Sequence, residues 1–314
     1  MIYLTTSEQL KAANSSVTID LDIDSLESFV DEAEFEVLNI LGEPTINQIL
    51  SNAIPSGLLR RVIANIALAN YSSSGALLID NSGIFVSKSN SKAPASDKKL
   101  LNFRIDTTER ACKALEQLVG YMEANITTYT AWKTSGFRDA YHITLFGNSG
   151  EFASFGGIAI SATLFKIIKP MIGRVEEDVL HSNFGIELIN ELRSQRLDNT
   201  LTLPMKKLER KLMRIVAPLA IAQAIPMQLL NLSDGGVFEV SVVALGNTSD
   251  NVQALSTVSH NRLNMVLGKL VTEGEAVLQQ TKEWIKTNAT DYPLYVVRDS
   301  IDRDGLHSEN VYLL

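Results

Sequence analysis

The chain has 314 residues, of which 28 are Lys or Arg and 36 are Asp or Glu, so its formal net charge is −8. Its length predicts two domains, and a composition that is 45% hydrophobic and 20% charged excludes a disordered chain or a collagen-like repeat. The single cysteine, Cys112, excludes an internal disulfide and fits a reducing compartment. The acidic balance argues against a simple nucleic-acid binder, which presents a basic face to phosphates.

The first strong signal is an amphipathic helix over residues 26–38, where apolar residues recur at the spacing of a helix that buries one face. Asp24, with Glu27 three residues later, indicates its start, and Gly42 and Pro44 indicate its end. The apolar stripe consists of Leu26, Phe29, Val30, Ala33, Val37 and Leu38.

Three further elements follow in the first half. The spacing predicts a second helix near residues 58–71, a short strand at residues 84–86 and a long helix from near Asp106 to Lys133. Residues 87–99 are small, polar and poor in apolar side chains, which is typical of a loop.

The second half repeats these landmarks in the same order. Their separation grows from 142 or 143 residues in the first helix to 150 in the second and 152 or 153 beyond it, as loop insertions would produce. The matched segments are Glu36–Leu38 with Asp178–Leu180, Gly42 with Gly185, Ile46–Ile49 with Ile189–Leu192, Leu58 with Leu208, Arg60–Arg61 with Arg210–Lys211, Gly83–Val86 with Gly236–Glu239, Arg110 with Arg262, and Trp132 with Trp284.

We therefore expect a mainly α-helical protein made of two similar helical repeats, each with two shorter helices, a short β segment and one long helix. The first repeat is predicted at residues 1–155 and the second at residues 158–314, joined through the glycines near residues 147–157. In the second copy, Pro170 predicts a late start or a kink in the first helix, and the long helix is predicted from near Ser259 to Lys286.

One run, from Ile215 to Leu232, is about long enough to cross a membrane. It contains Pro218, Pro226 and several amide side chains, so a buried helix broken at proline is the better interpretation. The first residues lack a cationic segment followed by an apolar one, so no secretory signal is predicted. We expect a protein that does not bind membranes.

The sequence predicts no catalytic, cofactor-binding or metal-binding residues. His142, His181, His260 and His307 have no spacing that would place two on one helix face, and one cysteine excludes Cys-rich zinc modules. Residues 20–31 begin like a calcium loop, but Ser25 stands where such a loop needs glycine, so Asp20, Asp22 and Asp24 are interpreted as a helix cap and solvated neighbours.

Other polar residues have similarly plain interpretations. Cys112 follows Ala111 in the long helix and is expected to be a half-buried structural thiol. The glycines at 147, 150, 156 and 157 lack the Lys-Ser/Thr of a phosphate loop, and the pairs Glu32/Glu34 and Glu176/Glu177 are expected to be solvated. The basic pairs at the start of the second helices are interpreted as a solvated face, with contact to a polyanion or acidic partner as the alternative; they are Arg60–Arg61, Lys206–Lys207 and Arg210–Lys211.

The opening of the chain resembles the head–tail connector (adaptor) proteins of tailed bacteriophages and prophages. The resemblance rests on the start MIYLTTSEQL, the acidic helix Asp24–Ala33, the Gly/Pro break after it and the second helix Leu58–Tyr71. In that family a small helical subunit forms a ring beneath the portal through which DNA passes. This chain departs from the family in its duplication and its greater length.

The resemblance implies a non-enzymatic structural protein of a phage or prophage, located in the virion or the bacterial cytoplasm. Its partners would be other virion proteins, namely portal, head-closure or tail proteins, with a homo-oligomer as a further option and no sequence-specific binding of nucleic acid. Two alternatives stay open: a helical interaction or scaffold module of a mobile element, and an enzyme whose site lies between the two copies.

Overall fold

The computed structural model describes residues 3–4, 6–14, 23–74, 77–80, 83–86, 97–156, 160–233, 236–239 and 259–295. The chain divides into two compact units. The first comprises Met1–His142 with Ile160–Ile167, and the second comprises Ile143–Ala159 with Ile168–Leu314. The boundary expected from the sequence, at residues 155–158, therefore falls inside a segment of the second unit.

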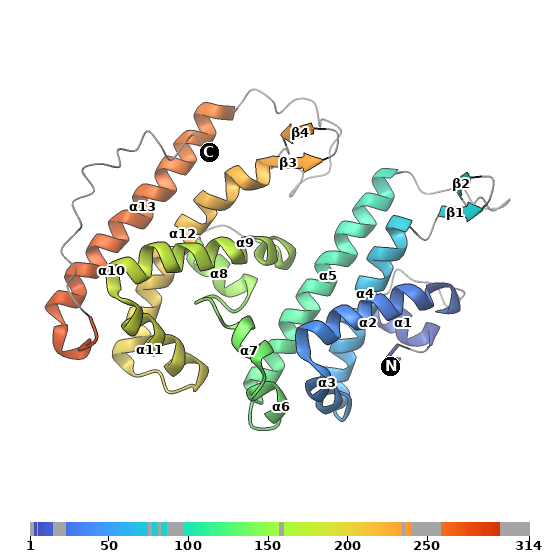
Figure 1. Ribbon diagram of the computed structural model, residues 1–314, viewed down its shortest axis with the longest axis horizontal. Coiled ribbons are helices and arrows are strands. Elements are labelled where there is room, and N and C mark those ends of the chain that lie inside the picture. Colours follow the sequence, from blue (N-terminus) through green and yellow to red (C-terminus); the bar gives the residue numbers. More distant parts are fainter. Residues whose placement is uncertain are drawn as a thin grey trace. The chain divides into compact units, whose positions relative to one another are not determined.

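The first unit is built around a pair of long helices that a short β-hairpin connects (Figure 1). α4 and α5 lie side by side, and β1 pairs antiparallel with β2 from Leu77↔Val86 to Asp80↔Gly83. The elements are α1 (Ser7–Ala13), the 3₁₀ turn η1 (Ile23–Leu26), α2 (Glu27–Leu41), α3 (Glu43–Leu50), α4 (Ala53–Ser74), β1 (Leu77–Asp80), β2 (Gly83–Val86), α5 (Asp97–Ala124), α6 (Thr130–Lys133) and α7 (Gly136–Tyr141).

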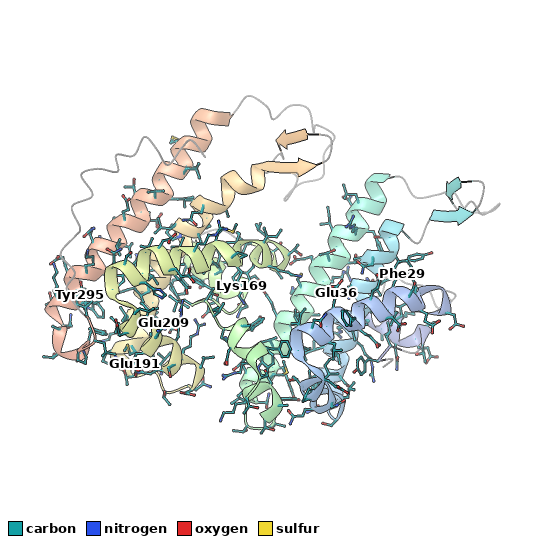
Figure 2. The ribbon with its side chains drawn as sticks, in the orientation of Figure 1. Phe29, Glu36, Lys169, Glu191, Glu209 and Tyr295 are labelled. Atoms are coloured by element: carbon teal, nitrogen blue, oxygen red, sulfur yellow. The ribbon has the colours of Figure 1, made fainter. Side chains whose placement is uncertain are left out.

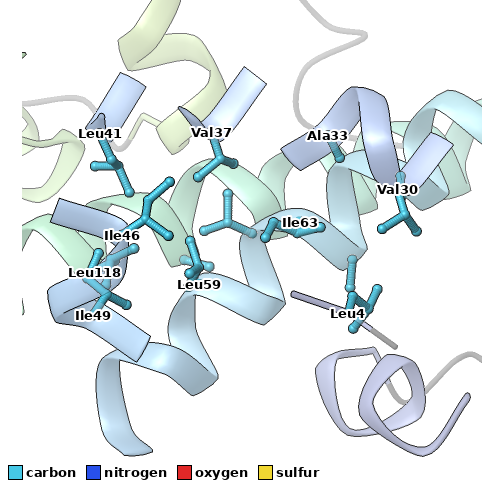
Figure 3. Packing of buried hydrophobic residues seen from close by; sticks show 14 of the residues in the cluster. Leu4, Val30, Ala33, Val37, Leu41, Ile46, Ile49, Leu59, Ile63 and Leu118 are labelled. Atoms are coloured by element: carbon cyan, nitrogen blue, oxygen red, sulfur yellow. The ribbon is translucent and has the colours of Figure 1, made fainter. Parts of the chain in front are cut away.

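The core of the first unit lies where α2, α3 and α5 meet α4. Figure 3 shows Val37 of α2, Ile46 of α3 and Leu118 of α5 around Leu59 and Ile63 of α4, and all five are fully buried. The predicted apolar stripe of residues 26–38 supplies the α2 side of this core through its members Leu26, Val30, Ala33 and Val37. Burial of such side chains contributes roughly 1.5–3 kcal/mol each. The packing of α2, α3 and α5 on α4 is therefore the main source of stability in this unit.

The second unit also contains two long helices joined by a β-hairpin, with β3 pairing antiparallel with β4 from Leu230↔Glu239 to Ser233↔Gly236. α12 packs against both α13 and α8. The elements are α8 (Ser149–Gly156), α9 (Ala162–Val175, of which residues 162–167 belong to the first unit), the π-helix η2 (Glu176–His181), α10 (Ser182–Phe184), α11 (Ile186–Leu197), α12 (Leu203–Leu229), β3 (Leu230–Ser233), β4 (Gly236–Glu239), α13 (Ser259–Thr287) and the 3₁₀ turn η4 (Ala289–Asp291).

The expectation of a mainly helical protein is confirmed. So is the end of the first helix at Gly42, where φ is +74° and the next helix starts at once. Gly185 ends α10 and starts α11 with φ of +87°. Because a positive φ in an extended backbone is almost restricted to glycine, both positions require this residue.

The predicted bounds of the first long helix were wrong. α5 begins at Asp97 and ends at Ala124, nine residues before the predicted start and end in each case. It stops because the Asn125 side chain donates a hydrogen bond back to the Tyr121 carbonyl at 2.9 Å and β-branched residues follow, which propagate a helix poorly. α13, in contrast, lies where it was predicted.

The match between the two tryptophans was also wrong. Trp132 lies in α6, beyond the end of α5, whereas Trp284 lies inside α13. The two residues therefore do not occupy the same element.

The predicted break of the run 215–232 at proline was wrong, because α12 continues through both Pro218 and Pro226. α9 starts at Ala162, before Pro170, and continues through it, so the late start given as one alternative there does not occur. Packing in the unit outweighs the loss of one backbone hydrogen bond at each ring. Among the described helices, none is both long enough and apolar enough to pass through a membrane.

Candidate functional site

The most buried charged group of the described chain is Glu176, the first residue of the π-helix, which is 0% exposed. Its Oε1 accepts the Leu145 backbone N–H at 2.7 Å, and its Oε2 accepts Nη2 of Arg193 at 2.7 Å. Burial raises the pKa of the Glu176 carboxyl, and the bonds from Leu145 and Arg193 oppose that rise. Both carboxylate oxygens are therefore occupied by partners from the protein itself.

A second charged group of the same unit surrounds Arg196 of α11. Its Nη2 lies 3.0 Å from both carboxylate oxygens of Glu151, and its Nε lies 3.4 Å from Oε1 of Glu209, labelled in Figure 2. Glu151 in turn accepts the backbone N–H of Gly147 at 2.7 Å. Burial raises the pKa of Glu209, and Arg196 opposes the rise. The group ties α8, α11 and α12 together.

Three buried polar atoms near these residues have no hydrogen-bond partner in the described part of the chain. They are Nε2 of His181, Nε of Arg193 and Nη1 of Arg196. Burial lowers the pKa of His181, and the charge of Arg193 lowers it further. A π-helix often marks a functional position, so these atoms form the candidate site of the second unit.

The first unit has a buried carboxylate in a similar setting. Glu34 of α2 is 6% exposed and accepts the backbone N–H of Tyr3. Burial raises the pKa of Glu34, and bonds from the Tyr3 and Leu4 amides oppose the rise. Arg60 of α4 donates to the Tyr3 carbonyl at 3.3 Å. Glu34 and Arg60 thus hold the leading segment of the chain against α2 and α4.

Glu123, near the end of α5, gathers the largest set of side-chain donors among the described residues. It accepts Nε1 of Trp132 at 2.7 Å, Nε and Nη2 of Arg138 at 2.9 Å each, and lies 3.0 Å from Nε2 of His142. Although burial alone would raise it, the bonds from His142, Arg138 and Trp132 lower the pKa of Glu123 to about 2. This Glu123 cluster fastens α6 and α7 to the end of α5.

The histidines and the cysteine do not form a common site among the described residues. His142 belongs to the Glu123 cluster and His181 to the π-helix, in different units. The side chain of His260 and all of His307 lie outside the described residues. Cys112 is half-buried, as expected, and burial raises the pKa of its thiol, which disfavours the reactive thiolate.

The remaining flagged residues are mostly structural or solvated. The predicted cap at Asp24 was wrong: Asp24 is exposed in the η1 turn, and the N-cap of α2 is Leu26. Asp20, Asp22 and Gly157 lie outside the described residues. Gly150 and Gly156 lie in α8, so they do not form a loop. Glu32 and Glu177 are exposed as expected, but the expectation that Glu34 and Glu176 are solvated was wrong, because each is buried and accepts backbone amides. The basic residues stay on exposed or half-exposed faces of α4 and α12; they are Arg60, Arg61, Lys206, Lys207, Arg210 and Lys211.

The buried charges of both units form ion pairs and hydrogen bonds with other groups of the protein. Glu176 has no surface open to a substrate, and Glu123 is already saturated with donors. No group of three or more His, Cys, Asp or Glu side chains in the described ranges could hold a metal ion. The sequence did contain a signal for the two buried carboxylates, Glu34 and Glu176. They are 142 residues apart, and each follows an apolar stripe residue, Ala33 or Val175.

A search of curated proteins and a search of solved structures returned no similar protein. A model of a family of unknown function, DUF6712, matches residues 30–141 and 168–305. These ranges make up most of the chain, one before and one after the segment 142–167. The chain belongs to the DUF6712 family of unknown function.

Proposed function

We propose that the chain is a tandem duplication of one helical unit and that it serves as a non-enzymatic structural protein of a phage or prophage, as a component of the head–tail connector. The observation that carries the proposal is the recurrence of the same contacts in both units, with no open reaction centre among the described residues. Three sets of contacts support the duplication.

The first set holds the leading segment of each unit. Leu4 and Leu145 are buried, and each lies in a segment whose backbone amides bond to the buried carboxylate Glu34 or Glu176. A capped helix follows: Thr6 Oγ1 accepts the Gln9 amide at 3.2 Å, and Asn148 Oδ1 accepts the Glu151 amide at 2.8 Å. These helices, α1 and α8, bury Leu10 and Phe152, and each packs on the long helix α4 or α12. On this basis the second copy begins at Ile143.

The second set surrounds the start of α4 and α12. Ile54-Pro55 and Leu203-Pro204 begin the two helices, and Leu59 and Leu208, four residues after the prolines, are both fully buried. These pairs are 149 residues apart, so the match of Leu58 with Leu208 at 150 residues is one position out of register.

The third set closes the long helices α5 and α13. Asn125 and Asn288 each donate a side-chain hydrogen bond to the carbonyl four residues earlier, at 2.9 and 2.7 Å. Those carbonyls belong to Tyr121 and Trp284, whose rings pack against Tyr129 and Tyr292 respectively. The matched residues are 163 apart, so Trp284 corresponds to Tyr121 and Trp132 corresponds to Tyr295.

The assignment to a connector rests on the resemblance of residues 1–71 to that family and on the character of the buried charges. In a duplicated enzyme we would expect at least one copy to keep an accessible constellation of reactive side chains. Here the strongest candidates for a reactive carboxylate, Glu123 and Glu176, already accept hydrogen bonds from arginine side chains of the protein itself. A protein that positions others is the function that fits this arrangement best.

The test is a particle assembly experiment. Deleting the gene from an inducible prophage should yield filled heads that lack tails, and the wild-type gene supplied in trans should restore infectious particles. The purified protein mixed with the portal ring of the same prophage should co-elute with it and add density beneath the ring in electron micrographs. Normal particles after deletion, together with no binding to the portal, would refute the proposal.

A scaffold or interaction module of a mobile element is the second candidate. It is favoured if the gene does not lie among genes for portal, capsid and tail proteins, because a connector is needed only where virions are built. The duplication would hold in either case.

A further inference from the structure

The two units present exposed helix stripes of opposite charge. On α2, Glu27, Asp31, Glu32, Phe35 and Glu36 are all exposed and follow the i, i+4, i+5, i+8, i+9 spacing of one helix face. We call this set the acidic stripe; Figure 2 labels Glu36 within it. On α12, Leu203, Lys206, Lys207, Arg210 and Arg214 are all exposed at i, i+3, i+4, i+7 and i+11, and we call this set the basic stripe.

The charges of both stripes lack ion-pair partners within the described part of the chain. The basic residues that form ion pairs there are Arg110, Arg138, His142, Arg193, Arg196 and Lys286, none of which belongs to the basic stripe. No residue of the acidic stripe forms one in the described ranges either. The chain as a whole has a net charge of −8, so a helix face with four exposed cations and no anion is a marked local departure.

Each stripe also carries one exposed large apolar side chain. Phe35 is 64% exposed in the middle of the acidic stripe, and Leu203 is 68% exposed at the start of the basic stripe. An apolar anchor surrounded by charges of one sign is the composition of a protein contact, in which the anchor supplies affinity and the charges select the partner. Contact with a polyanion would not need Phe35 or Leu203.

Two of the three cations closest to Pro204 in the basic stripe have no charged counterpart in the first unit. Lys206, Lys207 and Arg210 follow Pro204 by two, three and six residues, whereas Gly57, Leu58 and Arg61 follow Pro55 by the same intervals. A helix that begins with Ile-Pro or Leu-Pro therefore does not need lysines at the positions of Lys206 and Lys207. The stripes also have similar lengths, about 14 Å for Glu27–Glu36 and about 16 Å for Leu203–Arg214 at roughly 1.5 Å per residue.

We propose that the basic stripe of one copy of this chain docks on the acidic stripe of a second copy. Such a contact is head-to-tail, because two different surfaces meet and every subunit keeps one free stripe for the next neighbour. It buries Phe35 and Leu203 and pairs the cations of α12 with the carboxylates of α2. The inference does not depend on the connector assignment, since a scaffold could associate in the same way.

Charge reversal tests the contact by sedimentation velocity of the full chain over a range of protein and salt concentrations. The basic-reversed variant is K206E/K207E/R210E, and the acid-reversed variant is D31K/E32K/E36K. The wild type should associate at low salt and dissociate as salt screens the charges. Each reversed variant alone should associate at least about tenfold more weakly. An equimolar mixture of the two should recover the association, because opposite stripes again face each other.

Matched controls reverse three exposed charges outside the stripes, as K113E/K133E/K269E and E187K/E273K/E275K. These should associate like the wild type, which separates the stripes from the effect of net charge. The neutral variant K206Q/K207Q/R210Q covers the case in which reversal disturbs folding, and it should weaken association in the same direction. A wild type that stays monomeric at all concentrations, or reversed variants that fail to recover when mixed, would overturn the proposal. Binding of a DNA duplex that only the basic-reversed variant loses, with self-association unchanged, would assign the stripe to a polyanion instead.

Discussion

Tyr129 and Tyr292 are each 1% exposed, and each packs its ring against an aromatic residue eight positions earlier, near the end of a long helix. In the second unit the Tyr292 hydroxyl donates to the Pro204 carbonyl at 2.8 Å, which ties the end of α13 to the start of α12. Burial raises the pKa of Tyr292 to about 12, so the hydroxyl stays protonated and able to donate.

Tyr292→Phe should therefore destabilise the second unit by about 1 kcal/mol, because it leaves the Pro204 carbonyl without this donor while keeping the ring. Thermal unfolding measured by calorimetry checks the effect. Tyr71→Phe, which alters a half-buried tyrosine of the first unit, serves as the comparison. An equal loss in both variants would show that the Tyr292 bond has no special weight.

Glu176→Ala should cost about 3–5 kcal/mol, because it leaves Arg193 and the Leu145 amide unpaired in a buried site. The neighbouring substitution Glu177→Ala changes an exposed residue of the same π-helix and should stay within about 0.5 kcal/mol. Denaturant unfolding gives both values, and hydrogen exchange should place the loss at α8 and α11. A Glu176→Ala protein as stable as Glu177→Ala would contradict the burial of this ion pair.

Glu123→Gln should destabilise the first unit at neutral pH by about 3 kcal/mol, from a pKa difference of roughly two units at about 1.4 kcal/mol each. The folded pKa lies below the unfolded one, so this stabilisation is present above about pH 4.5 and is lost as the pH falls towards 2. The difference in the free energy of unfolding between wild type and variant should therefore disappear as the pH is lowered.

Trp132 fluorescence in a W284F background reports this unfolding, because Trp132 donates directly to Glu123. The control is Glu283→Gln, which removes an exposed partner of Lys286 and should show a small gap at every pH. A gap that does not change with pH would mean that the Glu123 charge contributes nothing.

Gly42→Ala and Gly185→Ala should each destabilise the protein by roughly 1–3 kcal/mol, since both glycines have positive φ with an extended ψ. Gly42→Ala should cost more, because its new Cβ would lie 2.8 Å from the Phe137 ring, whereas the nearest atom at Gly185 is 3.5 Å away. In a double-mutant cycle, Phe137→Ala should remove the difference. Equal costs in the two single variants would show that the Phe137 ring moves freely aside.

The helical class and several boundaries could be predicted because they depend on local patterns. The stripe of residues 26–38 follows from helix periodicity, and the helix end at Gly42 follows from the backbone freedom of glycine. Both can be recognised from neighbouring residues in the sequence. Gly185, which was matched to Gly42, likewise lies between two helices.

The long helix and the tryptophan match failed because they depended on counting residues across loops of unequal length. Nineteen residues separate β4 from α13, whereas ten separate β2 from α5, so a fixed spacing of 152 residues aligned Trp284 with the wrong residue. Chemical identity also misled the alignment, since Trp284 shares its setting with Tyr121, another aromatic residue.

The sequence next to each buried carboxylate did not predict its burial, because burial depends on distant partners; the only signal was the 142-residue spacing of Glu34 and Glu176. Glu176 meets Leu145, 31 positions earlier, and Arg193, 17 positions later. Nothing in the local sequence distinguishes it from Glu177, which is exposed. The glycines near residues 147–157 were likewise interpreted as the join between the repeats, although α8 packs on α12.

The π-helix gives the second unit a tolerance to changes in length. Gly42 comes eight residues after Glu34, and Gly185 comes nine residues after Glu176. A regular helix with one more residue would rotate its far end by about 100°, which would carry either the carboxylate or the glycine turn away from its neighbours. The wider turn at Glu176–His181 takes up the additional residue locally, so both ends keep their contacts. The second unit therefore keeps the contacts of Glu176 and the turn at Gly185, although this segment is one residue longer than the one from Glu34 to Gly42.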